Sequence, residues 1–299
     1  MYKHLFPKKI ANKLYKKWNL AIDMFIKHYP DIKLNKLLLD LKGVHGFPMI
    51  SGKYLYKLEL LNDSKNIFNR KERVELLCQR KLFNICYPIE ILSDKDSVCY
   101  KYEYFSNGDL LEYVYKHHLT YNEIDVILTK CLTIIHRIHR ENYLHYDIKP
   151  ENIFIKGNRY NQTPIFGDIE TMRHTSENID GTTLGTNTYH PPKNINIYYN
   201  HLDIYAFGKT VYKILCIQFL HDVEDCGLDK HKIEKWLSTP YSSCLDIYKD
   251  VDTEDDSIEL IITKWLNIAY DCCVLNEFNH TNNQNYPFFY IGDIYKKYI

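Results

Sequence analysis

The sequence predicts an α+β protein in which a small, strand-rich region with one main helix precedes a larger, mostly helical region. Three observations support this division. Apolar residues recur at three- to four-residue intervals over residues 8–29, short apolar runs broken by glycine and proline follow over 36–61, and helical periodicity prevails after residue 106. We therefore expect a helical extension at 1–35, a small region at 36–105 and a large region at 106–299.

The first expected helix, over residues 8–29, has an apolar stripe and a lysine-rich remainder. Ile10, Leu14, Trp18 and Ile22 recur at helical spacing, whereas the lysines fall mostly elsewhere. Such a stripe either packs against the rest of the protein or contacts a partner or a membrane surface. The sequence leaves both interpretations open.

The rest of the small region is expected to hold a sheet and one helix. Glycines and Pro48 divide residues 36–61 into three short strands with tight turns. A helix is predicted over residues 70–83, and two further strands over 88–92 and 98–105.

The large region contains a clear helix start. Thr120 and Glu123 have the spacing of a capping box, in which each side chain satisfies a backbone N–H at the other position. A long helix with a buried apolar stripe should follow, and further helices are predicted over 202–220, 231–237 and 257–275.

Composition argues against several classes of protein. The 299 residues include 38 basic and 38 acidic side chains and carry no net charge, so we expect no nucleic-acid partner. No apolar run approaches the roughly 20 residues that span a bilayer, so no transmembrane segment is expected. Nine cysteines without a C-x-x-C pair or a signal peptide predict free thiols and a cytoplasmic location. The tyrosine-, lysine- and asparagine-rich composition is typical of AT-rich genomes, so the cytoplasm would be that of a host if the protein is viral or a secreted effector.

The most informative segment runs from His145 to Ile155 and reads His-Tyr-Asp-Ile-Lys-Pro-Glu-Asn-Ile-Phe-Ile, with Asp168 following after the next apolar run. Phosphoryl transfer needs a carboxylate beside the attacking hydroxyl, a cation near the transferred group and oxygen ligands for Mg²⁺. A loop that bears Asp, Lys and Asn, with a second Asp after the next strand, supplies all of these groups.

In the order of its motifs the sequence resembles the eukaryotic-type protein kinases, over roughly residues 36–295. The segment at 145–152 is followed by Gly-Thr-x-x-Tyr-x-Pro-Pro at 185–192 and by Asp-Ile-Tyr-Ala-Phe-Gly at 203–208. The resemblance implies a bilobal protein-kinase-like fold and a serine/threonine protein kinase. Such an enzyme moves the γ-phosphoryl group of ATP to a protein substrate with the help of Mg²⁺ or Mn²⁺.

Residue by residue, the resemblance assigns catalytic roles to Asp147 and Lys149 and metal binding to Asn152 and Asp168. Asp147 would orient the substrate hydroxyl, and Lys149 would contact the γ-phosphate. A lysine two residues after the catalytic aspartate, as Lys149 is here, is typical of serine/threonine kinases.

The resemblance also implies a set of residues that bind the nucleotide. Lys57 would hold the α- and β-phosphates and pair with a glutamate on the next helix. Glu72 is preferred over Glu75 as this partner because the residue one helical turn after it is the apolar Leu76, at a position where the family packs an apolar side chain. Asp109 would meet a ribose hydroxyl. The implied nucleotide-binding residues are Lys57, Glu72, Glu103, Phe105, Asp109, Phe154, Gly43 and Gly46.

Three departures from the family pattern bear on activity. Tyr146 stands where many kinases have an arginine that clamps a phosphorylated loop, so activity should not depend on such phosphorylation. Glu170 replaces a glycine after the metal-binding aspartate, and residues 43–46 are shorter than the family's G-x-G-x-x-G loop. The alternatives are a pseudokinase, which would act as a nucleotide-binding or interaction scaffold, and a small-molecule kinase of the aminoglycoside or choline type.

Overall fold

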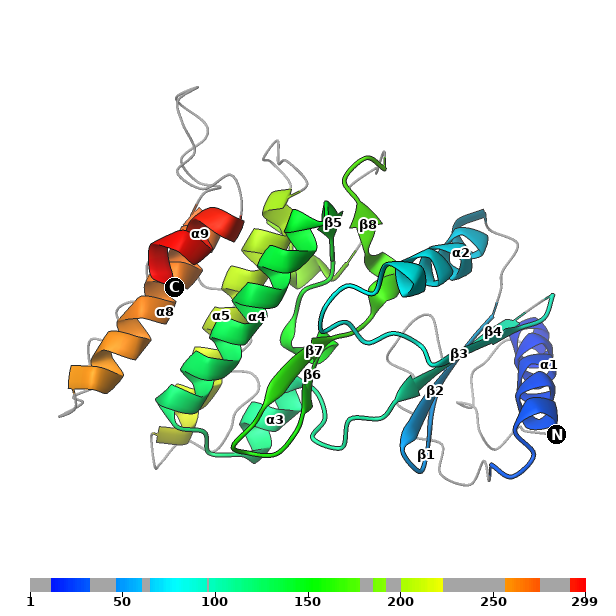
Figure 1. Ribbon diagram of the computed structural model, residues 1–299. Coiled ribbons are helices and arrows are strands. Elements are labelled where there is room, and N and C mark those ends of the chain that lie inside the picture. Colours follow the sequence, from blue (N-terminus) through cyan, green and yellow to red (C-terminus); the bar gives the residue numbers. More distant parts are fainter. Residues whose placement is uncertain are drawn as a thin grey trace. The chain divides into compact units, whose positions relative to one another are not determined.

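The computed structural model describes residues 12–32, 47–60, 65–95, 97–177, 185–191, 200–222, 256–274 and 291–299. The chain divides into two compact units (Figure 1). The first comprises residues 1–81 and 85–106 and contains an antiparallel sheet, and the second comprises 82–84 and 107–299 and is mostly helical. This division into a small sheet unit and a larger helical unit confirms the predicted fold class.

The sheet of the first unit has four antiparallel strands in the order β1-β2-β4-β3. Gly52, at φ +57°, supplies the left-handed conformation that the tight turn between β1 and β2 requires. The helix α2 begins earlier than predicted, and the part of the predicted sheet at 36–46, with Gly43 and Gly46, lies outside the described residues. The elements of this unit are α1 (Asn12–His28), β1 (Phe47–Ser51), β2 (Tyr54–Leu60), α2 (Lys65–Arg80), β3 (Glu90–Ser93) and β4 (Ser97–Glu103).

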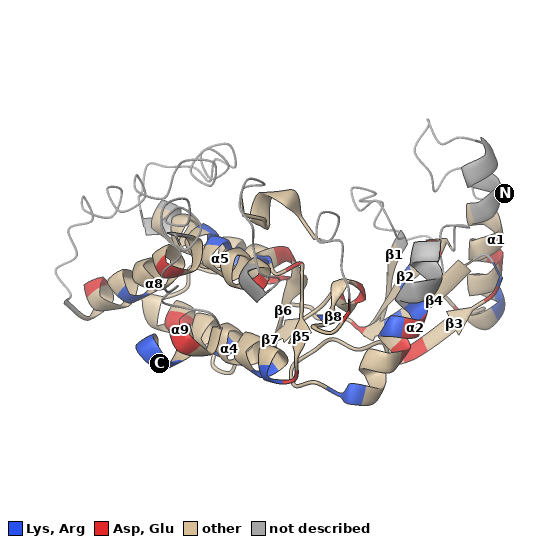
Figure 2. Ribbon diagram, turned by 90° about the horizontal axis from the view of Figure 1, so that it is seen from above, with Lys and Arg blue, Asp and Glu red and all other residues tan. Residues whose placement is uncertain are grey.

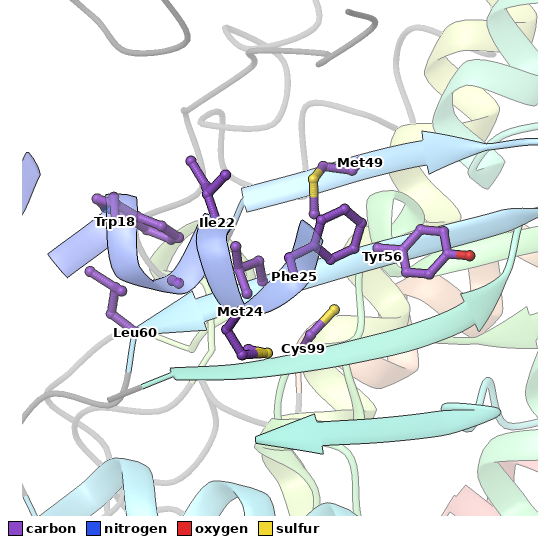
Figure 3. Close-up of a cluster of buried hydrophobic side chains, with 10 residues drawn as sticks. Trp18, Ile22, Met24, Phe25, Met49, Tyr56, Leu60 and Cys99 are labelled. Carbon is purple, nitrogen blue, oxygen red and sulfur yellow. The ribbon is translucent and has the colours of Figure 1, made fainter. Parts of the chain in front are cut away.

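Helix α1 packs on this sheet through its apolar stripe. Phe25 is fully buried and meets the ring of Tyr56 on β2 edge to face, with the ring centroids 5.4 Å apart. Figure 3 shows Trp18 and Ile22 of the same helix in this cluster, together with Met49 of β1. Of the two interpretations of the stripe, packing within its own unit is therefore observed.

A lysine surrounded by tyrosines joins the end of α1 to the sheet. The Lys101 ammonium lies 4.6 Å from the ring centroid of Tyr54 and 5.4 Å from that of Tyr29. The Tyr29 hydroxyl donates to Glu90 at 2.9 Å, and Lys101 donates to the same carboxylate oxygen at 3.3 Å. Cation–π and charge-assisted contacts of this kind fix the helix at a defined place on the sheet.

The second unit is built on helices that pack against one another. Helix α5 lies beside α8, and α4 contacts α5, α8 and α9 (Figure 1). The capping box of α4 is confirmed, because Thr120 Oγ1 accepts from Glu123 N–H at 3.2 Å and Glu123 Oε2 accepts from Thr120 N–H at 2.8 Å. The expected helix at 231–237 lies outside the described residues. The helices are α3 (Leu110–Lys116), α4 (Tyr121–Arg140), α5 (Asn200–Asp222), α8 (Asp256–Val274) and α9 (Ile291–Tyr298).

The described part of this unit also contains two antiparallel pairs of short strands, the β6–β7 hairpin and the pair of β5 with β8. Within the described ranges, no helix is long and apolar enough to cross a membrane. The strands are β5 (Tyr143–Leu144), β6 (Ile153–Lys156), β7 (Thr163–Phe166) and β8 (Arg173–His174).

The packing of α1 predicts a large effect of Phe25→Ala on stability. Truncation of a fully buried aromatic side chain costs about 3–5 kcal/mol of the free energy of unfolding. Leu20→Ala on the same helix is the matched control, since Leu20 is 57% exposed and its loss should change stability by about 0.5 kcal/mol at most. Urea denaturation measures both values, and equal effects of the two substitutions would contradict the docked position of α1.

Candidate active site

The predicted catalytic loop lies between β5 and the short helix η3 (Pro150–Asn152), and the β6–β7 hairpin then returns the chain to it. Ile153 at the start of β6 is paired with Phe166 at the end of β7. As a result, Gly167 N–H donates to the carbonyl of Asn152 at 2.8 Å. His145 Nε2 donates to the carbonyl of Gly167 at 2.9 Å. These bonds hold Asp168 next to the loop.

The start of the loop is anchored by a buried carboxylate on α5. Asp203 is fully buried, and its two oxygens accept from the backbone N–H groups of His145 at 2.7 Å and Tyr146 at 2.8 Å. His139 Nε2 donates to the same carboxylate at 3.0 Å. Burial alone would raise the pKa of Asp203, but the hydrogen bond and charge of His139 and the bonds around His145 bring it below the ordinary value.

Asp147 is the centre of a network of polar side chains. Lys149 Nζ donates to Asp147 Oδ2 at 3.0 Å and to Thr186 Oγ1 at 2.7 Å, and Thr186 Oγ1 donates to Asp147 Oδ1 at 2.7 Å. Asn152 Nδ2 donates to Asp147 Oδ2 at 2.8 Å and to its carbonyl at 2.8 Å. Both predicted catalytic residues and one predicted metal ligand are therefore brought together.

The segment that carries Thr186 reaches the loop through a close approach of two backbones. A side chain at Gly185, which has φ +84°, would place its Cβ 2.1 Å from the carbonyl oxygen of Tyr146. Only glycine allows this contact. The short helix η5 (Asn187–Tyr189) follows directly and continues the segment.

The chemistry of the predicted metal ligands fits a hard cation. Asn152 uses its Nδ2 to hold Asp147, which leaves Oδ1 as the oxygen that the amide can offer. Asp168 adds a carboxylate, and its backbone takes the left-handed conformation at φ 55° at the start of η4 (Ile169–Thr171). An amide oxygen and a carboxylate are ligands that Mg²⁺ and Mn²⁺ accept.

Two of the predicted nucleotide-binding residues of the second unit are also adjacent. Asp109 and Phe154 form an isolated antiparallel bridge. A Cβ at Gly167 would lie 2.4 Å from the ring of Phe154, so any side chain at this position would clash with the ring. Asp109 is the N-cap of α3, where its Oδ1 accepts from Glu112 N–H at 2.8 Å.

The other predicted nucleotide-binding residues lie in the first unit. Lys57 is on β2, and its Nζ lies 3.3 Å from Glu59 Oε1. Glu103 is exposed at the end of β4, and Phe105 is buried just beyond it.

The choice between Glu72 and Glu75 as the partner of Lys57 stays a prediction. Both lie on α2, where Glu72 is exposed and Glu75 pairs with Lys71 at 3.6 Å. Leu76 is 60% exposed, so the packing that favoured Glu72 is not observed.

Thr186 and Asp203 contact the predicted catalytic loop but receive no role from the sequence, although both stand in motifs that resemble the kinase family. A signal for Asp203 existed, because an acidic residue at the start of an apolar helix is costly to bury without partners. For Thr186 the signal was the preceding glycine, which permits a close backbone contact.

The pKa of Asp109 predicts a pH-dependent contribution to stability. Burial raises this pKa to about 6, more than the hydrogen bond from Glu112 lowers it, whereas the unfolded value is about 3.9. The folded state therefore binds the proton more tightly than the unfolded state. As pH rises from about 3.9 to about 6, the free energy of unfolding should fall by at most about 3 kcal/mol. In Asp109→Asn, which keeps the helix cap, this fall should be absent. Urea titrations at several pH values compare the two proteins, and parallel pH profiles would contradict the assignment.

Comparison with known proteins places the chain in a family. The protein kinase domain model matches residues 53–270. A probable serine/threonine-protein kinase of Dictyostelium discoideum is 31% identical over 111 residues, which are 35% of this chain and 15% of that protein. The Aurora kinase of Yarrowia lipolytica is 33% identical over 26% of this chain and 21% of its own length. The maternal embryonic leucine zipper kinase of Xenopus tropicalis is 25% identical over 53% of this chain and 26% of its own length.

The matched stretches thus span about a quarter or less of these relatives. The family match, by contrast, covers most of this chain and includes the predicted catalytic loop, Asp168 and Thr186. The chain belongs to the protein kinase domain family.

Proposed function

We propose that this protein is a serine/threonine protein kinase, which uses ATP and Mg²⁺ or Mn²⁺ to phosphorylate a protein hydroxyl. The observation that carries the proposal is the network in which Asp147 is bonded at once by Lys149, Asn152 and Thr186. In this role Asp147 accepts the hydrogen bond of the substrate hydroxyl and orients it toward the phosphoryl group. The ammonium of Lys149 offsets negative charge on the transferred group.

The position of Thr186 supports a serine or threonine as the acceptor. Its hydroxyl bonds both Asp147 and Lys149, so the segment at 185–191 is held against the catalytic loop. A lysine two residues after the catalytic aspartate and a threonine bonded to both are the features that support serine or threonine as the acceptor.

Asn152 and Asp168 would hold the divalent cation, which neutralises phosphate charge when it is bound. We propose that Lys57, with Glu72 or Glu75, binds the phosphates, and that Asp109 and Phe154 contact the ribose and the base. Glu103 and Phe105 would contribute backbone groups to the adenine.

Tyr146 supports independence from loop phosphorylation. The side chain at this position is buried, and its backbone N–H is held by Asp203 rather than by a loop residue. Thr186 also reaches Asp147 in the unmodified chain.

We place the protein in the cytoplasm, of a host if it is viral or secreted.

One observation favours a second candidate, a pseudokinase that serves as a scaffold. Glu170 follows two residues after Asp168 and is only 4% exposed, so a carboxylate stands where the family has a permissive glycine. An added negative charge close to Asp168 could change how phosphates are bound.

A phosphoryl-transfer assay tests the leading proposal. Transfer from radiolabelled ATP to a generic protein substrate, with Mg²⁺ or Mn²⁺, should fall by a factor of about 100 to 10,000 in Asp147→Asn, because the group that orients the hydroxyl is lost. Asp168→Ala should fall comparably. The matched control is Asp125→Asn, an identical chemical change at a residue that binds Lys264 and Trp265. Absence of transfer by the unmodified protein with either metal would reject the kinase.

Thermal unfolding with Mg·ATP then separates the two candidates from a protein that binds no nucleotide. A ligand at 100 times its Kd stabilises the native state by about 2.7 kcal/mol. We expect a rise in Tm that Asp168→Ala reduces. A rise without any transfer would favour the nucleotide-binding scaffold.

A further inference from the structure

A second charged cluster lies beside the catalytic network and takes no part in the chemistry proposed above. Lys213 of α5 lies with its Nζ 2.6 Å from Glu151 Oε1 and 3.0 Å from the hydroxyl of Tyr189. The Tyr189 hydroxyl in turn donates to Glu151 Oε2 at 3.4 Å. The three side chains come from η3, η5 and α5 and form a closed, charge-neutral group.

The position of this cluster puts it next to the acceptor. Glu151 immediately precedes Asn152, which bonds Asp147, and Tyr189 follows three residues after Thr186, which bonds Asp147 as well. The charge of Asp147 also contributes to raising the pKa of Tyr189, after burial and Glu151. Glu151 and Tyr189 therefore lie close to the residue that would accept the substrate hydroxyl.

The exposure of Glu151 and Lys213 determines which of the two charges a bound peptide would contact. The Glu151 side chain is 35% exposed and can contact a ligand, whereas the Lys213 side chain is only 13% exposed. Alone, Glu151 would attract a cationic side chain. The ammonium of Lys213, 2.6 Å from Glu151 and partly buried, largely cancels that attraction, because solvent screens the field of a partly buried charge only weakly. Figure 2 shows that α5 carries both basic and acidic residues, so the helix does not restore a net charge of either sign.

We infer that Lys213 is a specificity-determining residue that neutralises Glu151, so that the protein does not select substrates by a basic residue close to the acceptor serine or threonine. The inference deepens the proposed kinase function and rests on it. It predicts that removal of the Lys213 ammonium turns the same surface into a subsite for arginine or lysine.

The test uses a short neutral peptide with one serine and matched peptides in which one residue before the serine is arginine. For the unmodified protein, the ratio of kcat/KM for the best arginine peptide to that for the neutral peptide should be close to unity. Lys213→Met keeps the aliphatic packing and should raise this ratio about tenfold, mainly through KM. Glu151→Gln leaves the lysine charge and should move the ratio in the opposite direction. The double variant should return to the original ratio.

Lys264→Met is the control, because it removes the ammonium of another half-buried ion pair, with Asp125, and should leave the ratio unchanged. Binding of the same peptides with alanine in place of serine, measured by fluorescence anisotropy, keeps the inference separate from catalysis. A shift in binding without transfer would reject the kinase but support the role of Lys213. An unmodified protein that already prefers arginine tenfold, or an equal ratio in all variants, would overturn the inference. If Lys213→Met does not fold, the opposite shift expected for Glu151→Gln decides.

Discussion

The geometry of the candidate active site depends on the buried carboxylate of Asp203. A fully buried charge is expensive, and the cost is offset here by two backbone N–H groups and by His139. Because the donors belong to His145 and Tyr146, the carboxylate fixes the backbone of the predicted catalytic loop itself. Tyr146 has φ 65°, an unfavourable conformation for a non-glycine residue, and the bond from its N–H to Asp203 helps to maintain it.

Once the loop is fixed, its contacts determine where the segment at 185–191 can lie. Gly185 allows the two backbones to approach, and Thr186 then bonds Asp147. Tyr189 is held by Lys213 from α5, the same helix that carries Asp203. Helix α5 thus supports both the predicted catalytic loop and the segment at 185–191, so the geometry of the candidate site depends on the packing of α5 in the second unit.

The sequence predicted what depends on local patterns. The stripe of α1, the capping box at Thr120 and the strand that follows the loop at Asp147 are set by residues close together in the chain, and the structure agrees. Contacts between distant segments were harder to predict. The bond from Thr186 to Asp147 and the pairing of Lys213 with Glu151 depend on how α5 and η5 pack, which hydrophobic periodicity does not specify. The exposure of Leu76 is a further case, since helical spacing alone does not determine which face is covered.

The polar network also bears on the choice between an enzyme and a scaffold. Lys149, Thr186 and Asn152 all direct their donors at Asp147, and each gives up contacts with water to do so. Networks of this kind contribute little net stability, because desolvation offsets most of the attraction between the groups. A protein that only binds partners does not need three donors directed at one carboxylate. The arrangement of a cation, a hydroxyl and an amide around one carboxylate therefore supports the proposed phosphoryl transfer, which needs that carboxylate in a fixed orientation.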